Sequence, residues 1–140
     1  MLSIDDRLYL STKNRQEGLS IIHYTLGAVE SQFADIVWAH APLSTAALVK
    51  LCEEALHWKR TTTYTVLKKL GEKGFFQLKD GTVTVLVSRE DYYAAQSEKF
   101  ISETFDGSLP AFFAAFTKRK NISPKELQEI RRMIDSFEEG

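Results

Sequence analysis

The sequence predicts a mainly helical protein with one small β-hairpin, and two observations lead to this prediction. Apolar residues recur at the three- and four-residue spacing of helices over residues 26–70 and again over residues 88–137. Between these stretches the period changes to two, in the runs FFQLK and TVTVLV, which flank Asp80 and Gly81. An Asp-Gly pair between such runs is a strong hairpin signal, because a type I′ turn needs positive φ at both central residues.

Three helices are predicted before the hairpin. The first ends before Pro42, Ser44 caps a second helix that runs to Leu56, and a third begins near residue 60 and ends at Gly74 in a C-cap position. The apolar positions of the three helices are Leu26, Val29, Phe33, Ile36 and Val37 in the first, Leu48, Leu51, Cys52 and Ala55 in the second, and Thr63, Val66, Leu67 and Leu70 in the third.

Three further helices are predicted after the hairpin. Ser88 opens a helix that runs to about Phe105, and a short, strongly apolar helix follows. Ser123 caps the last helix, with Pro124 at its first position and Glu126 closing a capping box.

Length and composition indicate a small globular protein in a reducing compartment. The chain has 140 residues, is 44% hydrophobic and 26% charged, and carries a net charge of −1. The single cysteine excludes a disulfide framework and a cysteine-rich zinc site. No apolar run approaches the roughly 18 residues of a membrane helix, and the N-terminus does not have the pattern of a signal peptide. We therefore expect a cytoplasmic protein without membrane insertion.

The third helix carries two different faces. Thr63 shares the apolar face, whereas Thr61, Thr65 and Lys68 lie on the opposite side. Short hydroxyl side chains at the start of a helix suit close approach to DNA, and nearby cations favour phosphate. A threonine run is often only the capped start of a solvated helix. Here it lies in the third helix, directly before a hairpin, which is the arrangement of a winged helix-turn-helix whose third helix enters the major groove.

The interpretation as a winged helix gives a set of residues expected to contact double-stranded DNA. The recognition helix spans about residues 60–73, and the hairpin tip is expected to touch the DNA backbone. The predicted contacts are Lys59, Arg60, Thr61, Thr62, Tyr64, Thr65, Lys68 and Lys69 around the helix, and Lys79 and Thr82 beside the hairpin tip.

The C-terminal helices carry more apolar residues than a thin layer of helices can cover in a monomer, which predicts a homodimer. We expect an N-terminal extension over residues 1–20, a winged helix over residues 21–88 and a helical dimerisation domain over residues 89–140. The phenylalanines of this last region also suit a ligand pocket, although a core or dimer interface is favoured. The predicted interface residues are Phe100, Ile101, Phe105, Leu109, Phe112, Phe113, Phe116, Leu127, Ile130, Ile134 and Phe137.

Several stretches resemble the BlaI/MecI penicillinase-repressor family of bacterial transcription factors: VESQFADIVW, WKRTTTYTVLKKLGEKGFF and the Asp-Gly hairpin that follows. In that family a Glu eight residues before a Trp marks the first helix, as Glu30 and Trp38 do here. A W-x-x-x-T-x-x-T pattern marks the recognition helix and is matched by Trp58, Thr62 and Thr65. The segments DGSLPAFFAAF and ISPKELQEI resemble the family's dimerisation arm, so the resemblance covers about residues 25–140.

The resemblance implies a homodimeric repressor of transcription that binds a palindromic operator. Carried over by position, it implies that Thr61, Thr62, Thr65 and Lys69 contact DNA. It also implies a membrane-bound sensor and protease system as a further partner, which releases the repressor by cutting its arm.

Two departures from the family pattern affect regulation. The family's best-known members are cut at an Asn–Phe bond, and the matching bond here joins Ala115 to Phe116. We therefore predict that cleavage at this bond is not the switch; cleavage elsewhere, as in the segment TKRKN, and release by a ligand stay open. The copper-responsive branch carries C-terminal CxC motifs, which this sequence lacks.

Two other classes of function fit the sequence less well. Winged helices also serve as protein-interaction modules, which would show no salt-dependent binding to duplex DNA. An enzyme would need a nucleophile with its base, or a glycine-rich phosphate loop, and neither can be picked out. No cofactor or metal is expected: His23 and His40 are isolated, and His57 with Cys52 supplies too few ligands for zinc.

Overall fold

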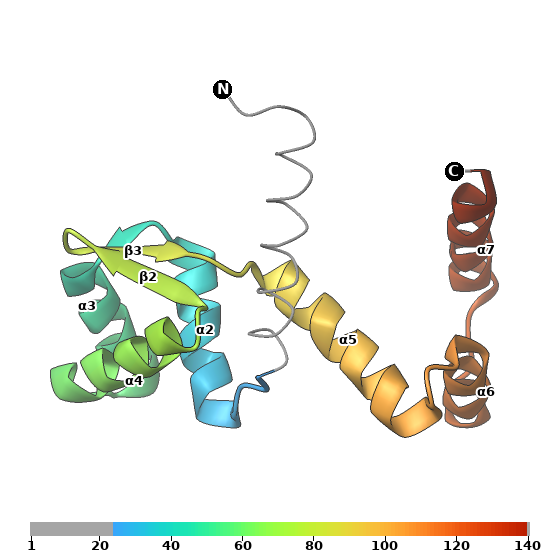
Figure 1. Cartoon of the computed structure of the whole chain (residues 1–140), viewed down its shortest axis with the longest axis horizontal. Coiled ribbons are helices and arrows are strands. Elements are labelled where there is room, and N and C mark those ends of the chain that lie inside the picture. The colour runs from blue at the N-terminus through green and yellow to red at the C-terminus, as the bar shows by residue number, and fades with distance from the viewer. Residues whose placement is uncertain (1–23, 140) are drawn as a thin grey trace. The chain divides into compact units, whose positions relative to one another are not determined.

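The computed structural model describes residues 24–139 and confirms the predicted fold class. Within this range the chain forms six helices and a three-stranded antiparallel sheet (Figure 1). The N-terminal extension expected over residues 1–20 and His23 lie outside the described residues. The elements are α2 (Ala28–His40), β1 (Leu43–Ser44), α3 (Thr45–Leu56), α4 (Arg60–Glu72), β2 (Phe76–Lys79), β3 (Thr82–Val85), α5 (Arg89–Phe105), α6 (Leu109–Arg119) and α7 (Pro124–Glu139).

The hairpin forms where the Asp-Gly pair predicted it. Asp80 has φ 51° and Gly81 has φ 72°, as a type I′ turn requires. β2 and β3 pair in antiparallel register, with Leu78 opposite Val83. The short strand β1 adds to the other edge of β3, giving the order β1-β3-β2. β1 was not predicted from the sequence, because two residues are too few to show an alternating pattern.

The predicted N-caps are present. The hydroxyls of Ser44, Ser88 and Ser123 each accept a hydrogen bond from the backbone N–H three residues later, at 3.1, 3.0 and 3.1 Å. Each bond satisfies one of the N–H groups that the first turn of a helix leaves without an intrahelical partner. Local sequence therefore sets where α3, α5 and α7 begin.

One aromatic and aliphatic core holds the winged helix together. Its largest fully buried side chains include Phe33, Phe75 and Phe76. For two residues the expectation that they lie on the core-facing side is wrong. Val29, in the first turn of α2, is 56% exposed, and Ala55, in the last turn of α3, is also exposed. Helical spacing identifies the side of a helix, but it does not show how far along the helix the core extends.

The start of α5 belongs to this core. Tyr92 is 3% exposed, and its hydroxyl accepts a hydrogen bond of 2.9 Å from the backbone N–H of Leu26. Ala95 is buried one turn later. The contacts of the chain divide it into two compact units that meet after Lys99, within α5. The domain boundary expected after Ser88 stays a prediction.

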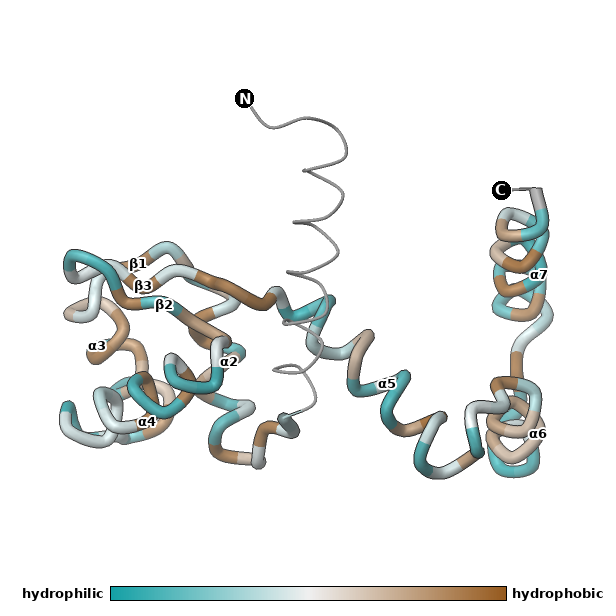
Figure 2. Tube along the Cα trace, in the orientation of Figure 1, coloured by the Kyte–Doolittle hydropathy of each residue, from teal (hydrophilic) through white to brown (hydrophobic). Residues whose placement is uncertain are grey.

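The second unit, described from Phe100 to Glu139, lacks a fully buried side chain over residues 100–138. Phe105 and Phe112 pack edge to face with ring centroids 5.7 Å apart, and Phe100 contacts both rings. Apolar and polar residues alternate around α7 (Figure 2), where Phe137 is 82% exposed. These side chains form an apolar surface that the unit itself does not cover.

We expect Tyr92→Phe to destabilise the winged helix by about 1–3 kcal/mol, because the buried N–H of Leu26 would lose its acceptor. Tyr93→Phe is the matched control, since Tyr93 is the next residue but 44% exposed. Urea unfolding followed by tryptophan fluorescence measures both. Equal stability of the two variants would show that the Tyr92 hydroxyl contributes nothing.

Candidate nucleic-acid interface

Helix α4 is fixed by its inner face and exposed on its outer face. Thr63, Leu67 and Leu70 are buried, and the helix packs against α3 and β2. The outer positions predicted from the helical wheel, Thr61, Thr65 and Lys68, are all exposed, and so is Thr62. The structure therefore presents hydroxyls and a cation on one continuous face.

Thr63, one member of the threonine run, faces the core. It is 1% exposed, and within residues 24–139 its Oγ1 has no hydrogen-bond partner. Burial raises the pKa of the neighbouring Cys52 thiol, and the Thr63 hydroxyl opposes that effect only in part. A buried thiol that stays protonated is unreactive, so Cys52 is a core residue, as its position on the apolar face of α3 indicated.

Thr65 already uses its hydroxyl hydrogen. Its Oγ1 donates to the carbonyl oxygen of Thr61 at 2.9 Å, four residues earlier on the same helix. In this conformation Thr65 offers its methyl group and its oxygen lone pairs to the outside. These groups suit a thymine methyl or an amino group of adenine or cytosine in the major groove.

The start of α4 differs from those of α3 and α6, which Ser44 and Ser108 cap. Its N-cap residue, Lys59, makes no side-chain capping bond, and its first turn carries no acidic residue. The unpaired N–H groups and the positive end of the helix dipole favour an anion at this position. The guanidinium of Arg60 lies 5.5 Å from the ring centroid of Tyr64, which adds a positive charge beside the first turn.

Tyr64 is held between α3 and α4. A hydrogen bond to Thr45, followed by one to Arg60, lowers the pKa of the Tyr64 hydroxyl from its ordinary value. The ring is half-buried, so Tyr64 is placed to orient Arg60 at the helix start. Its predicted contact with DNA stays a prediction.

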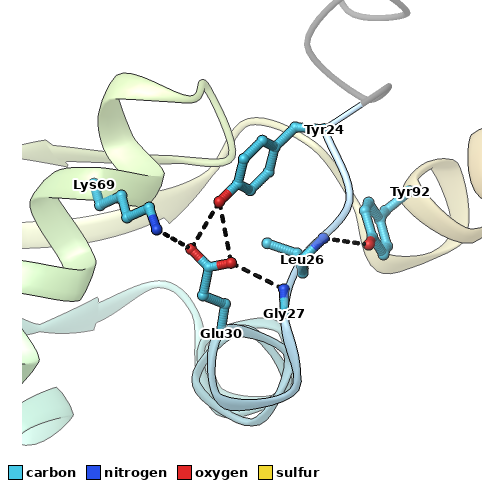
Figure 3. Close-up of polar contacts among 6 residues, drawn as sticks. All are labelled: Tyr24, Leu26, Gly27, Glu30, Lys69 and Tyr92. Carbon is cyan, nitrogen blue, oxygen red and sulfur yellow. Dashed lines mark hydrogen bonds and ion pairs between the residues drawn. The ribbon is translucent and has the colours of Figure 1, made fainter.

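Lys69 is tied to the first helix by the Glu30 cluster, which comprises Tyr24, Gly27, Glu30 and Lys69 (Figure 3). The Lys69 ammonium lies 3.1 Å from Oε2 of Glu30, the Tyr24 hydroxyl donates to the same carboxylate, and the Gly27 N–H donates to Oε1 at 2.9 Å. The sequence analysis assigned Lys69 to DNA and used Glu30 only as a family marker. Their pairing was not predicted, since its only local signal was a glutamate at the third position of α2, three residues after the N-cap Gly27.

The Glu30 cluster stabilises the ionised carboxylate. Burial alone raises the pKa of Glu30, but the hydrogen bond from Gly27 and the contacts with Lys69 and Tyr24 outweigh it, so the pKa lies below the ordinary value of 4.5. The hydrogen bond to Glu30, with a smaller effect of Tyr24, raises the pKa of the Lys69 ammonium. Both groups are therefore charged at neutral pH. Lys69 keeps 55% of its side chain exposed, so its predicted contact with phosphate stays a prediction.

Gly74 determines where α4 ends and the hairpin begins. Gly74 has φ 85°, its N–H donates to the carbonyl of Gly71, and the N–H of Phe75 donates to the carbonyl of Leu70. These two bonds form a Schellman motif, in which glycine tolerates the left-handed position. The motif turns the chain directly from α4 into β2.

The two predicted hairpin contacts lie on the outer face of the hairpin. Lys79 pairs with Thr82 beside the turn, and neither side chain is buried. Because side chains alternate along a strand, Lys79 points to the opposite face from Leu78, which faces α4. Their contact with DNA stays a prediction.

Other kinds of site find no support in the described part of the chain. Over residues 24–139, no group of three or more His, Cys, Asp or Glu side chains is arranged to hold a metal ion. Across the same range, no helix is both long and apolar enough to cross a membrane.

We expect acid to weaken the winged helix through Glu30. Since its folded pKa is lowered, Glu30 contributes stability above its unfolded value near 4.5, and that contribution is lost as pH falls through the folded pKa. The variant Glu30→Gln should be less stable at neutral pH and depend less on pH in the acid range. Glu72→Gln, on the exposed face of α4, is the control. Urea unfolding between pH 3 and pH 7 measures the free energy of unfolding of each variant. If this free energy fell with pH as steeply in Glu30→Gln as in the parent, the prediction would be contradicted.

Comparison with known proteins agrees with this geometry. The family model described as penicillinase repressor matches residues 26–136. A penicillinase repressor of Bacillus licheniformis is 24% identical over 110 residues, which cover 76% of this chain and 86% of that protein. The residues behind the resemblance serve the core: the Trp58 ring stacks on Phe33, and Trp38 Nε1 donates to the carbonyl of Val87. The chain belongs to the penicillinase repressor family of transcriptional regulators.

Proposed function

We propose that the protein is a DNA-binding transcriptional repressor that acts as a homodimer on a palindromic operator, with α4 in the major groove. One observation carries the proposal: the exposed face of α4 joins threonine hydroxyls to cations, beside a helix start without a capping side chain or an acid. This combination fits a polyanion that is read through base edges.

The contacts divide by chemistry. Thr61, Thr62 and Thr65 are short enough for base edges, and Thr65 presents its methyl and lone pairs. The longer cationic side chains of the surface reach phosphates, which give affinity but no sequence information. These cationic residues are Lys59, Arg60, Lys68 and Lys79. Thr82 and Tyr64 are proposed as backbone contacts, and Lys69 would reach phosphate only by sharing its charge with Glu30.

The proposed dimer interface is the uncovered apolar surface of the second unit. Phe116 is 45% exposed, Ile134 is 52% exposed and Leu109 is 64% exposed, although all lie on helices. Soluble monomers rarely leave a surface with this many large apolar side chains in water. A second copy of the chain covers it in a symmetric way, and that symmetry accounts for a palindromic operator.

Release from DNA is proposed to occur without cleavage at the family's usual bond. The bond between Ala115 and Phe116 lies within α6, where the backbone is hydrogen-bonded. A protease needs an extended strand and would require local unfolding of the helix. A membrane-bound sensor and protease system is retained as a proposed partner on the strength of the family alone. Mass spectrometry of the repressor from induced cells tests whether the bond between Ala115 and Phe116 is cut. A fragment ending at Ala115 would refute release without cleavage at this bond.

The alternative is a winged helix that binds only proteins. This alternative makes the opposite prediction for DNA. A module that binds only proteins would show no salt-dependent binding to duplex DNA. An enzyme is not proposed, since the family is one of regulators.

We expect Thr65→Ala and Lys68→Gln to change DNA binding in different ways. Loss of Thr65 should cost about 1–3 kcal/mol on the operator and relax sequence preference. Loss of Lys68 should weaken all sequences alike and lower the salt slope by about one. Fluorescence anisotropy with operator fragments selected from genomic DNA, at several salt concentrations, measures both effects. Parent protein without salt-dependent binding to duplex DNA would reject the function, and two variants with the parent's behaviour would reject the placement of α4.

We expect the parent to sediment as a dimer at micromolar concentration and Ile134→Glu to sediment as a monomer. Ile134 lies on the apolar side of α7, where a new carboxylate would be buried in the interface. Ser136→Glu adds the same charge two residues later, on the polar side of the helix, and should leave the dimer intact. A monomeric parent of 15.9 kDa would contradict the proposed assembly.

A further inference from the structure

Helix α4 and strand β2 border a groove whose apolar lining is not explained by the predicted DNA contacts. Its volume is about 380 Å³. Leu67 and Phe76 are buried at its base, and Leu78 is 49% exposed at its edge. The groove is lined by Tyr64, Leu67, Lys68, Gly71, Phe76 and Leu78.

The sequence builds this groove in two ways. Gly71 has no side chain; a Cβ at this position would make ordinary van der Waals contact with the carbonyl oxygen of Phe76, at 3.7 Å, and would fill part of the groove. Leu78 shares a strand face with Phe76, because side chains two residues apart point to the same side. Its partner across the hairpin, Val83, is fully buried, whereas Leu78 extends past the core into solvent.

The charge of the groove points to an anionic partner. Lys68 is the single charged residue among its lining residues, and none of them is a carboxylate. Lys68 also belongs to the exposed face of α4, so the groove is continuous with the surface proposed to meet DNA. A partner that fits must be apolar beside Leu78 and negatively charged beside Lys68.

We propose that this groove holds the sugar-phosphate edge of the DNA strand that borders α4, with Leu78 packed on a deoxyribose and Lys68 on the adjacent phosphate. The proposal rests on the proposed function and adds an apolar contact to it. Deoxyribose carries C–H surface between consecutive phosphates, which matches the order of apolar and cationic residues in the groove. Since every nucleotide has the same sugar, the contact strengthens binding without selecting a sequence.

The test compares Leu78→Ala with Leu78→Met and Leu86→Ala, by anisotropy on the operator and on unrelated duplex DNA. Leu86 is 55% exposed in the segment after β3 and does not line the groove, so Leu86→Ala removes the same atoms elsewhere. We expect Leu78→Ala to lose three- to tenfold in affinity, on the order expected for a few lost methyl contacts. The loss should be the same on both DNAs, and the salt slope should not change. Leu78→Met should retain the parent's affinity, and Leu86→Ala should match the parent.

The other results are equally informative. Parent affinity in Leu78→Ala overturns the proposal while the proposed function stands. If Leu78→Ala lost affinity only for the operator, Leu78 would contact a base. If its salt slope changed, the substitution would have altered the phosphate contacts of the cations. Either result overturns the proposed contact with the sugar. A parent that binds no duplex DNA removes the proposed function and this contact together, and an apolar peptide would then be the partner that fits the groove. Thermal unfolding of each variant ensures that a loss of binding is not a loss of fold.

Discussion

The burial of one face of α4 is the constraint on which the rest of the interface depends. Thr63, Leu67 and Leu70 are removed from water against α3 and β2, and this fixes the rotation of the helix about its axis. Once the rotation is set, Thr61, Thr65 and Lys68 can only face outward. A turn of the helix by one residue would bury a lysine and expose leucines, at a cost of several kcal/mol.

The Glu30 cluster adds a second constraint, near the C-terminal end of α4. Packing fixes rotation, whereas the contact between Lys69 and Glu30 fixes the end of α4 against the start of α2 (Figure 3). The same carboxylate holds the chain before α2 through Tyr24 and Gly27. One glutamate therefore links the end of α4 to the start of α2 and to the short segment that precedes α2. It also places a negative charge beside a cation of the proposed DNA surface, which limits how strongly that cation attracts phosphate.

Sequence reasoning succeeded where the determining physics is local. The Asp-Gly turn and the serine caps at Ser44, Ser88 and Ser123 involve groups within a few residues, so their signals lie in short stretches. The α4 faces were also predictable, since they follow from helical geometry alone. The missed features join distant residues. The bond from Leu26 to Tyr92 spans 66 positions, and no periodicity encodes it. The groove beside Leu78 arises only after β2 folds back along α4.

A single winged helix of this kind gives only weak selectivity, which is why the second unit matters to the proposed function. In the proposed function the exposed face of α4 offers three threonines to base edges, and each mismatch at such a contact would cost only about 1–3 kcal/mol. A genome presents so many competing sites that one half-site would be lost among them. Joining two copies makes the second half-site contact intramolecular, and selectivity then grows by orders of magnitude without any new contact. The pairing that the proposed function requires would then account for the apolar side chains that α6 and α7 leave exposed, which are costly in a monomer.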